Sequence, residues 1–225
     1  MGRPIEHLCG TPGKLHHVGV VQASFVDLTE AAGPRPLGDT VERTMLAEGA
    51  WVDIRPDWLA GSEALFARLE SSVPWKAERR RMYDRVVDVP RLVAFYEEGA
   101  TLPDPLLEAA RRALQAQYSE VAGGPFCTTG LCLYRDGRDS VAWHGDTNGR
   151  GATDDTVVAI LSLGARRRFL LRPRVGGTSL RFDIGDGDLL VMGGSCQRTW
   201  EHSVPKTARQ LGPRISVQFR QRGVS

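Results

Sequence analysis

The sequence has few cysteines, few lysines and no long hydrophobic run. Its four cysteines form no C-x-x-C pair and no zinc-finger spacing. No segment has 18 consecutive apolar residues, and the first residues lack the apolar run of a signal peptide. We therefore expect a reduced, cytoplasmic protein that does not associate with a membrane.

Lysine occurs only at positions 14, 76 and 206, so nearly all of the 29 basic residues are arginine. Arginine suits bidentate contacts to phosphate and carboxylate, but a genomic codon bias explains the same ratio, so only the placement of individual arginines is informative. The net charge of +2 does not by itself indicate nucleic acid. With 225 residues, 41% hydrophobic and 25% charged, the chain is typical of a soluble globular protein with a substantial core.

The first 124 residues predict helices, short strands and a basic segment. Residues 1–16 are rich in Gly, Pro and His and are expected to form a loose arm. The elements expected next are strands over 18–26 and 51–54, and helices over 39–49, 57–69, 90–98 and 104–118. The segment 73–90 is irregular, aromatic and very basic. Residues 17–124 are therefore expected to cover the part of the chain that follows.

After Gly123-Gly124-Pro125 the sequence changes to short, alternating or β-branched runs separated by glycine-rich turns. These predicted strands span residues 126–134, 140–144, 156–163, 168–172, 178–182, 188–192 and 214–220. So many short strands favour a barrel or sandwich over a βαβ sheet. No boundary resembles a flexible linker, so one domain over residues 1–225 is expected, of α+β class and mainly β.

A histidine and a carboxylate stand two residues apart in the segment Trp143-His144-Gly145-Asp146. On a strand, residues i and i+2 share a face, so both side chains would project to the same side. His202 is the one later histidine, and with it the set becomes the two-histidine, one-carboxylate arrangement of non-haem Fe(II) oxygenases. Simpler interpretations stay open: a structural His144 bonded to a turn aspartate, and a surface His202 before a proline turn.

The last predicted strand, Arg214 to Arg220, alternates strictly between an apolar face and a polar face. The polar face carries Arg214, Ser216, Gln218 and Arg220. A solvated surface explains this pattern, and a buried anion site explains it equally well. A dicarboxylate such as 2-oxoglutarate is best held at its distal carboxylate by a bidentate guanidinium, while its other end can chelate iron.

The order of these motifs resembles that of the AlkB-type 2-oxoglutarate- and Fe(II)-dependent dioxygenases. The resemblance covers residues 125–221, where Tyr134 leads into His144-Gly145-Asp146, followed by His202 and the strand from Arg214 to Arg220. A weaker resemblance, from Trp75 through residues 79–84 to Arg91, is to the nucleotide-recognition lid of that family. The implied fold is a double-stranded β-helix (jelly roll) over 125–222, with N-terminal helices and the lid over 17–124.

Site residues follow from the resemblance. It implies that the catalytic iron ligands are His144, Asp146 and His202. The implied cosubstrate-binding residues are Tyr134, Arg214, Arg220, Ser216 and Cys132. The implied substrate-binding residues are Trp75, Arg79, Arg80, Arg81, Tyr83, Trp143 and Asn148. For each aromatic residue a place in the core is the alternative, and for each arginine a solvated loop is the alternative.

Several positions depart from the pattern of the family. Cys132 stands where Asn is frequent, and Ser216 and Gln218 replace the usual Asn and Thr, so one amide hydrogen bond to the cosubstrate is expected to be lost or rerouted. Thr147 and Asn148 follow Asp146 where family members commonly carry acidic residues that touch the substrate base. These departures leave the substrate open.

The implied reaction is oxidative demethylation of N-alkylated bases in DNA or RNA. Fe(II), O2 and 2-oxoglutarate would yield succinate, carbon dioxide and formaldehyde, and the base must be single-stranded or flipped out of a duplex to reach the iron. A monomer is expected. Two alternatives remain: a 2-oxoglutarate-dependent hydroxylase of a protein side chain or small molecule, and a non-catalytic jelly-roll binding protein with structural histidines.

Overall fold

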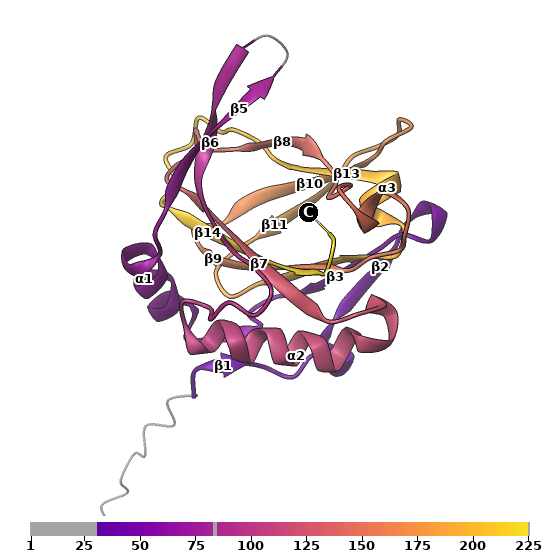
Figure 1. The fold of residues 1–225 in the computed structure, drawn as a ribbon, viewed down its shortest axis with the longest axis horizontal. Helices are drawn as coiled ribbons and strands as arrows, with labels where there is room; N and C mark the ends of the chain where they lie inside the picture. Colours follow the sequence, from indigo (N-terminus) through magenta and orange to yellow (C-terminus); the bar gives the residue numbers. More distant parts are fainter. Residues whose placement is uncertain (1–30, 83–84, 225) are drawn as a thin grey trace, which may run out of the picture.

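Two antiparallel sheets face each other in the computed structural model, which describes residues 31–82 and 85–224 (Figure 1). The predicted arm over 1–16 and the predicted strand over 18–26 lie outside the described residues. The larger sheet contains, in spatial order, β2 (Glu42–Met45), β3 (Trp51–Arg55), β12 (Leu189–Gly193), β9 (Val158–Gly164), β14 (Arg214–Gln221), β7 (Phe126–Tyr134), β6 (Arg85–Tyr96) and β5 (Lys76–Met82). The smaller sheet contains β11 (Leu180–Ile184), β10 (Arg167–Pro173), β13 (Trp200–Val204) and β8 (Val141–His144).

This arrangement confirms the mainly β jelly roll expected from the sequence. All seven strands predicted after residue 125 are present, and each of their bounds lies within two residues of the predicted one. An eighth strand, β13, was not predicted, and it carries His202. A short pair, β1 (Gly33–Pro34) with β4 (Leu59–Ala60), completes the described sheets.

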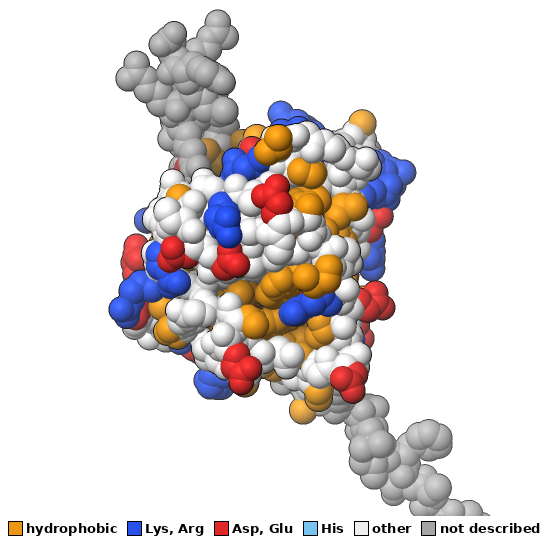
Figure 2. Space-filling view, turned by 90° about the vertical axis from the view of Figure 1, so that its right-hand side faces the viewer, with side chains coloured by type: hydrophobic (Ala, Val, Ile, Leu, Met, Phe, Trp, Pro, Cys, Tyr) orange, Lys and Arg blue, Asp and Glu red, His pale blue; other side chains and the backbone are white. Residues whose placement is uncertain are grey.

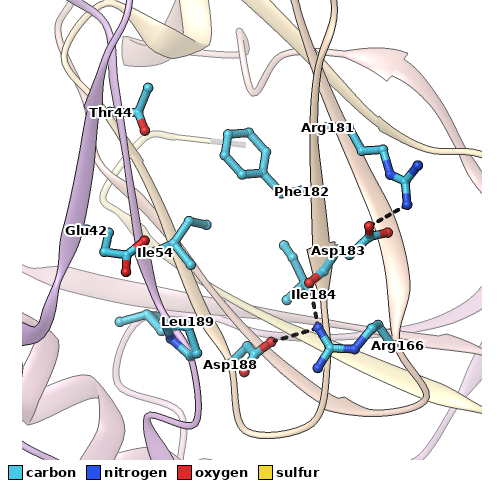
Figure 3. Close-up of a pocket in the computed structure, with 11 residues that line it drawn as sticks. Glu42, Thr44, Ile54, Arg166, Arg181, Phe182, Asp183, Ile184, Asp188 and Leu189 are labelled. Atoms are coloured by element: carbon cyan, nitrogen blue, oxygen red, sulfur yellow. Dashed lines mark hydrogen bonds and ion pairs between the residues drawn. The ribbon is translucent and has the colours of Figure 1, made fainter.

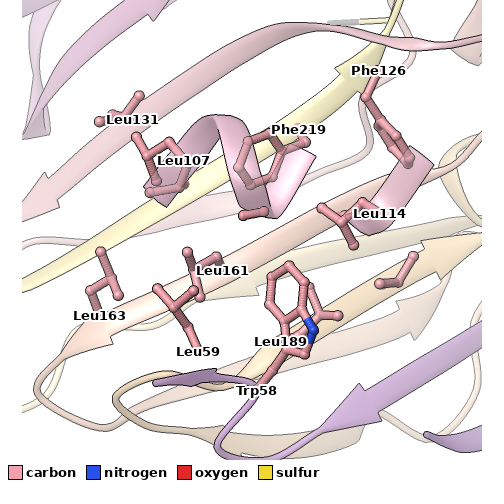
Figure 4. Packing of buried hydrophobic residues seen from close by; sticks show 14 of the residues in the cluster. Trp58, Leu59, Leu107, Leu114, Phe126, Leu131, Leu161, Leu163, Leu189 and Phe219 are labelled. Carbon is pink, nitrogen blue, oxygen red and sulfur yellow. The ribbon is translucent and has the colours of Figure 1, made fainter. Parts of the chain in front are cut away.

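Two helices, α1 (Ser62–Ser72) and α2 (Pro105–Ala122), lie on the outer face of the larger sheet (Figure 1). Helix α2 begins where predicted, because the Asp104 side chain accepts a hydrogen bond from the Leu106 N–H at 2.9 Å and Pro105 fits the first turn. Its buried face, which includes Leu107 and Leu114, packs on Leu161 and Phe219 of the sheet (Figure 4). Within the described ranges, no helix combines the length and apolar character needed to span a bilayer.

Strand β14 is buried on both faces, which excludes the solvated-face interpretation of its alternation. Ile215, Val217 and Phe219 are fully buried in the core between the helices and the larger sheet. On the other face Arg214 is 1% exposed and Gln218 is 8% exposed. The polar row therefore points into the space between the two sheets, where a second apolar cluster also packs.

Two predicted helices are wrong. Residues 39–49 form β2 between the 3-10 turns Gly38–Thr40 and Ala47–Gly49, because hydrogen bonding to β3 decides their conformation although all four strand side chains are exposed. Of the predicted helix over 90–98, residues 90–96 continue β6, in which Leu92 packs on the helix-side core and Val93 faces the opposite side, a period of two.

The segment around the basic run also differs from expectation. Residues 73–90, predicted to be irregular, contribute the hairpin of β5 and β6, which projects from the body of the molecule (Figure 1). The helix predicted from Asp57 begins only at Ser62, because Asp57 has a left-handed φ of 52° and residues 59–60 form β4. Four more helical turns are short: α3 (Cys196–Thr199), the two turns beside β2, and Arg150–Ala152.

Candidate metal and cosubstrate site

Three side chains that suit a metal ion converge between the sheets. His202 on β13 lies directly opposite His144, the last residue of β8, in the antiparallel register. Their ring centroids are 4.2 Å apart, and His144 Nε2 lies 3.9 Å from Asp146 Oδ1. The potential ligand atoms of His144, Asp146 and His202 all lie within 4.8 Å of one another. The three predicted ligands are thus brought together.

Asp146 does not share a strand face with His144, contrary to the expectation from the sequence. Strand β8 ends at His144, so Asp146 lies in the turn beyond the strand and not on a shared strand face. The turn is closed by the Thr147 N–H, which donates to Gly145 O at 2.8 Å. The spacing led to the correct pair, but the turn and its contacts, described below, place the carboxylate.

Burial favours the neutral form of both imidazole rings, which is the form that binds a metal. His144 Nδ1 is 2.8 Å from the Ala142 carbonyl, which can only accept, so this nitrogen carries the proton and Nε2 is free to bind a metal. Burial lowers the pKa of His144. Burial, with repulsion from His144, lowers the pKa of His202 to about 3. Metal binding needs these neutral forms, because a protonated imidazole has no lone pair to donate.

Asp146 supplies a carboxylate that stays ionised. Burial alone would raise its pKa, but the Arg220 guanidinium, whose Nε donates to Asp146 Oδ2 at 2.6 Å, and the nearby imidazoles lower the pKa to about 2. The other oxygen, Oδ1, faces His144. Two neutral imidazoles and one carboxylate are the ligand set that suits non-haem Fe(II).

Arg214 lies on the same inward face of β14 as Arg220 and pairs with Tyr134 on β7. Its Nε donates to Ser162 Oγ at 2.9 Å, whereas its buried Nη1 has no hydrogen-bond partner among the described residues. Burial lowers the pKa of Arg214. Burial also raises the pKa of Tyr134 to about 12, so its hydroxyl remains a donor. A buried guanidinium with a free donor fits the distal carboxylate of 2-oxoglutarate.

The three substituted positions form one connected group. Gln218 Nε2 donates to Ser216 Oγ at 2.6 Å and to Ser216 O at 2.9 Å. The Cys132 Sγ lies 3.8 Å from Gln218 Oε1 and accepts from Arg91 Nε at 3.4 Å. The amide of Gln218 is thus bonded to its own strand, and Arg91 on β6 is the charged group beside Cys132.

A cavity of about 1000 Å³ is lined by two of the three candidate metal ligands, His144 and Asp146, whereas His202 is buried and does not line it. Its wall comes from β6, β7 and β14 of the larger sheet and from β8 and β13 of the smaller sheet, so it lies where the edge strand β8 faces β6. It reaches the upper end of the range of volumes typical of small-molecule sites. The cavity has room for a further group beside a bound dicarboxylate.

The predicted substrate residues are placed unequally. Trp143 and Asn148 line the cavity, and the Arg172 guanidinium carbon lies 4.2 Å from the centroid of the Trp143 ring. Trp75 instead packs against the helix-side core and donates its Nε1–H to Glu70 O at 3.1 Å. Residues 79–81 lie on β5, but their side chains, and Tyr83 as a whole, fall outside the described part of the chain. The roles of these seven residues stay predictions.

Sequence reasoning missed three residues that complete the site. Gln197, Ser162 and Arg167 are each no more than 3% exposed and contact a site residue. The guanidinium carbon of Arg167 lies 5.5 Å from the centroid of the Tyr134 ring. Ser162 could have been found from the inward polar position in its strand, next to Ser216. Gln197 had no signal in the sequence, because its partner is 51 residues away.

Comparisons with known proteins agree with this geometry. Residues 90–220, more than half of the chain, match the model of the 2OG-Fe(II) oxygenase superfamily. Alpha-ketoglutarate-dependent dioxygenase alkB homolog 3 of Homo sapiens is 32% identical over 200 residues, which cover 80% of this chain and 66% of that protein. DNA oxidative demethylase ALKBH2 of Arabidopsis thaliana is 29% identical over 195 residues, covering 71% of this chain and 62% of that protein. The chain thus spans slightly less than two thirds of the length of these relatives.

Solved structures support the fold. The structure of OsALKBH1 matches with a TM-score of 0.53 and 14% identity, covering 80% of this chain and 100% of that one. A prolyl hydroxylase from Trichoplax adhaerens, in complex with a hypoxia inducible factor peptide, matches with a TM-score of 0.53 and 12% identity, covering 76% and 83%. With the family match and the site geometry, these results show that the chain belongs to the 2OG-Fe(II) oxygenase superfamily, on its AlkB-type branch.

Proposed function

We propose that this protein is a 2-oxoglutarate- and Fe(II)-dependent dioxygenase that demethylates N-alkylated bases in DNA or RNA. The observation that carries the proposal is the buried Arg214, with its unpartnered Nη1, on the same strand face as Arg220, which holds the candidate ligand Asp146. An anion of the length of 2-oxoglutarate would satisfy the guanidinium at one end and chelate a metal at the other.

The residues of the chain have separate tasks in this reaction. His144, Asp146 and His202 would hold the metal, and Arg214 with the Tyr134 hydroxyl would bind the distal carboxylate. Arg220 orients the Asp146 carboxylate so that one oxygen remains for the metal. When bound, Fe(II), 2-oxoglutarate and O2 supply the oxidation of an N-methyl carbon, with succinate, carbon dioxide and formaldehyde as products.

A nucleic-acid substrate is supported by the relatives and by the opening of the cavity. Two of the similar proteins are named as an AlkB homolog and as a DNA oxidative demethylase. Trp143 lies at the cavity and offers an aromatic face to a single-stranded or flipped base. The face drawn in Figure 2, on the side of β2 and α3, carries Lys and Arg side chains interspersed with Asp and Glu around exposed hydrophobic side chains, and it shows no large basic patch. We therefore assign recognition of nucleic acid to the cavity and the β5–β6 hairpin. We further propose that the protein is monomeric and cytoplasmic.

The test is turnover with short methylated oligonucleotides. Purified protein with Fe(II), 2-oxoglutarate and O2 is expected to release succinate and formaldehyde in equal amounts from methylated single-stranded DNA or RNA, and to restore the base. Omission of 2-oxoglutarate and the substitution His144→Ala are each expected to abolish both products. A His144→Ala variant with the full rate would contradict the iron site.

The same assay separates the two alternatives. Turnover of a methylated protein or small molecule, without turnover of any oligonucleotide, would identify a hydroxylase with another substrate. Absence of succinate formation, with Fe(II) and 2-oxoglutarate both bound, would favour a binding protein. No contact in the described structure favours either alternative over nucleic acid.

A further inference from the structure

The candidate ligand Asp146 lies outside the strand ladders, so its placement needs another explanation. Strand β8 ends at His144, two residues earlier. Asp146 is nevertheless 4% exposed, in a turn that packs tightly against the segment after β12. A Cβ atom at Gly145 would lie 2.4 Å from Gln197 O and 3.2 Å from Trp200 O. Only glycine therefore allows the turn to approach this segment so closely.

Among residues 31–82 and 85–224, Gln197 makes the one side-chain hydrogen bond to the main chain of Asp146. Its Oε1 accepts a hydrogen bond from the Asp146 N–H at 2.9 Å, and both groups are buried. Its Nε2 lies 3.9 Å from Met192 Sδ, a weak acceptor. The side chain of Asp146 is held separately, by Arg220. The ligand thus has two independent restraints, one on its carboxylate and one on its backbone.

The position of Gln197 in the chain gives the contact a further consequence. Gln197 lies in α3, which leads directly into β13, the strand that carries His202. The segment that supplies one candidate ligand therefore also anchors the main chain of another. Because the bond joins residues 51 positions apart, it fixes the Asp146 turn relative to the His202 strand.

We propose that Gln197 is a positioning residue for the metal site. It holds the Asp146 main chain so that the carboxylate faces His144 and His202, and it does not touch the metal or the substrate. This inference rests on the proposed metal site. Outer partners that orient metal ligands typically change metal affinity by about 10- to 100-fold when they are removed. The carboxamide is uncharged, so its removal changes no ionisation in the site.

The test is titration of the full chain with Mn(II), which probes the site without oxidation chemistry. The variant Gln197→Met keeps the length of the side chain and removes the acceptor, and it is expected to bind Mn(II) about 10- to 100-fold more weakly. The variant Gln197→Glu keeps an acceptor oxygen and is expected to restore affinity. Calorimetry gives the affinities, and circular dichroism with thermal unfolding without metal shows whether the fold is kept.

Gln115 provides a matched control. Its Oε1 also accepts a backbone N–H, from Phe126 at 2.9 Å, but it lies on α2, away from the candidate ligands. Gln115→Met is expected to lose similar stability and to bind Mn(II) as the wild type does. Equal Mn(II) affinity of Gln197→Met and wild type would overturn the inference, as would an equal loss in Gln115→Met.

Two further outcomes are distinguishable. A wild-type protein that binds no Mn(II) would contradict the metal site itself, and with it the proposed function. If Gln197→Met does not fold, Gln197→Asn carries the test, because its amide is one methylene too short to reach the Asp146 N–H. Wild-type Mn(II) affinity in a folded Gln197→Asn would overturn the positioning role alone.

Discussion

Two cavities lie at opposite sides of the space between the two sheets, and they differ in how their charged groups are satisfied. The larger, of about 1000 Å³, lies between β8 and β6 and is lined by the candidate metal ligands His144 and Asp146. The smaller, of about 320 Å³, lies between β2 and β11 (Figure 3). In the smaller cavity Arg181 pairs with Asp183, and Arg166 Nη1 lies 3.8 Å from Asp188 Oδ2.

The difference is one of burial as well as pairing. The Arg166 side chain is 64% exposed, and exposed ion pairs contribute little free energy. Arg214 is 1% exposed and keeps a donor without a partner in the described structure. A buried cation with an unsatisfied donor is costly unless an anion binds it. Arg214 does not line the larger cavity itself, but it lies on the inward face of β14, the strand from which Gln218 and Arg220 line that cavity. This buried strand face is therefore suited to an anion, whereas both arginines of the smaller cavity already lie beside carboxylates.

The largest expected effect is that of removing the Asp146 carboxylate, compared with removal of the Asp183 carboxylate in the smaller cavity. Asp146→Ala removes a candidate ligand and leaves Arg220 without its partner, so we expect Mn(II) binding and turnover to fall to background, a larger loss than the roughly 10- to 100-fold cost of outer partners. Asp183→Ala removes an exposed ion pair and is expected to change neither. Calorimetric titration and succinate release measure both variants. Metal binding by Asp146→Ala at the wild-type level would remove the distinction between the cavities.

The second effect concerns the two arginines. Arg214→Met is expected to weaken 2-oxoglutarate binding by about 10- to 100-fold, because a hydrogen bond to a charged group contributes about 1.5–3 kcal/mol. Arg214→Lys keeps the charge but not the bidentate geometry, so its affinity for 2-oxoglutarate is expected to lie between that of the wild type and that of Arg214→Met. Arg166→Met in the smaller cavity is the control and is expected to bind as the wild type does. The measurement is titration with 2-oxoglutarate in the presence of Mn(II).

An equal loss in Arg214→Met and Arg166→Met would show that bulk charge, not the buried donor, attracts the cosubstrate. Unchanged binding in Arg214→Met would contradict the cosubstrate site. Arg214 also packs beside Tyr134, so thermal unfolding of each variant is needed to separate lost affinity from lost fold.

The sequence was most informative where local alternation and burial agree. The period of two from Arg214 to Arg220 predicted one strand with an apolar and a polar face. Both faces are buried, and burial of the polar face is what a cosubstrate site requires. The spacing of His144 and Asp146 predicted the correct pair, although the turn after β8 places them. His202 was proposed as the third ligand because it is the one later histidine, and the resemblance to a family then favoured this proposal over a surface histidine.

Local patterns failed where distant strands decide the structure. The run over 90–98 was predicted to be helical, yet pairing with β7 makes residues 90–96 part of β6. Strand β13 was not predicted, because Trp200–Val204 does not alternate between apolar and polar residues, although four of its five residues are buried. The anchor at Gln197 depends on a contact with Asp146 that the sequence does not indicate.

The smallest expected effect concerns an aromatic residue in each cavity, Trp143 in the larger and Phe182 in the smaller. Stacking of a base on an aromatic side chain contributes about 1–3 kcal/mol. Arg172 already lies 4.2 Å from the Trp143 ring centroid, so we expect Trp143→Ala to weaken binding of a methylated single-stranded oligonucleotide near the lower limit, by about 5-fold. Phe182→Ala is expected to leave oligonucleotide affinity unchanged.

Fluorescence anisotropy measures the oligonucleotide affinity of both variants, at one fixed salt concentration because phosphate contacts depend strongly on salt. A Phe182→Ala loss equal to that of Trp143→Ala would place nucleic acid at both cavities, and an unchanged Trp143→Ala would move recognition to the β5–β6 hairpin.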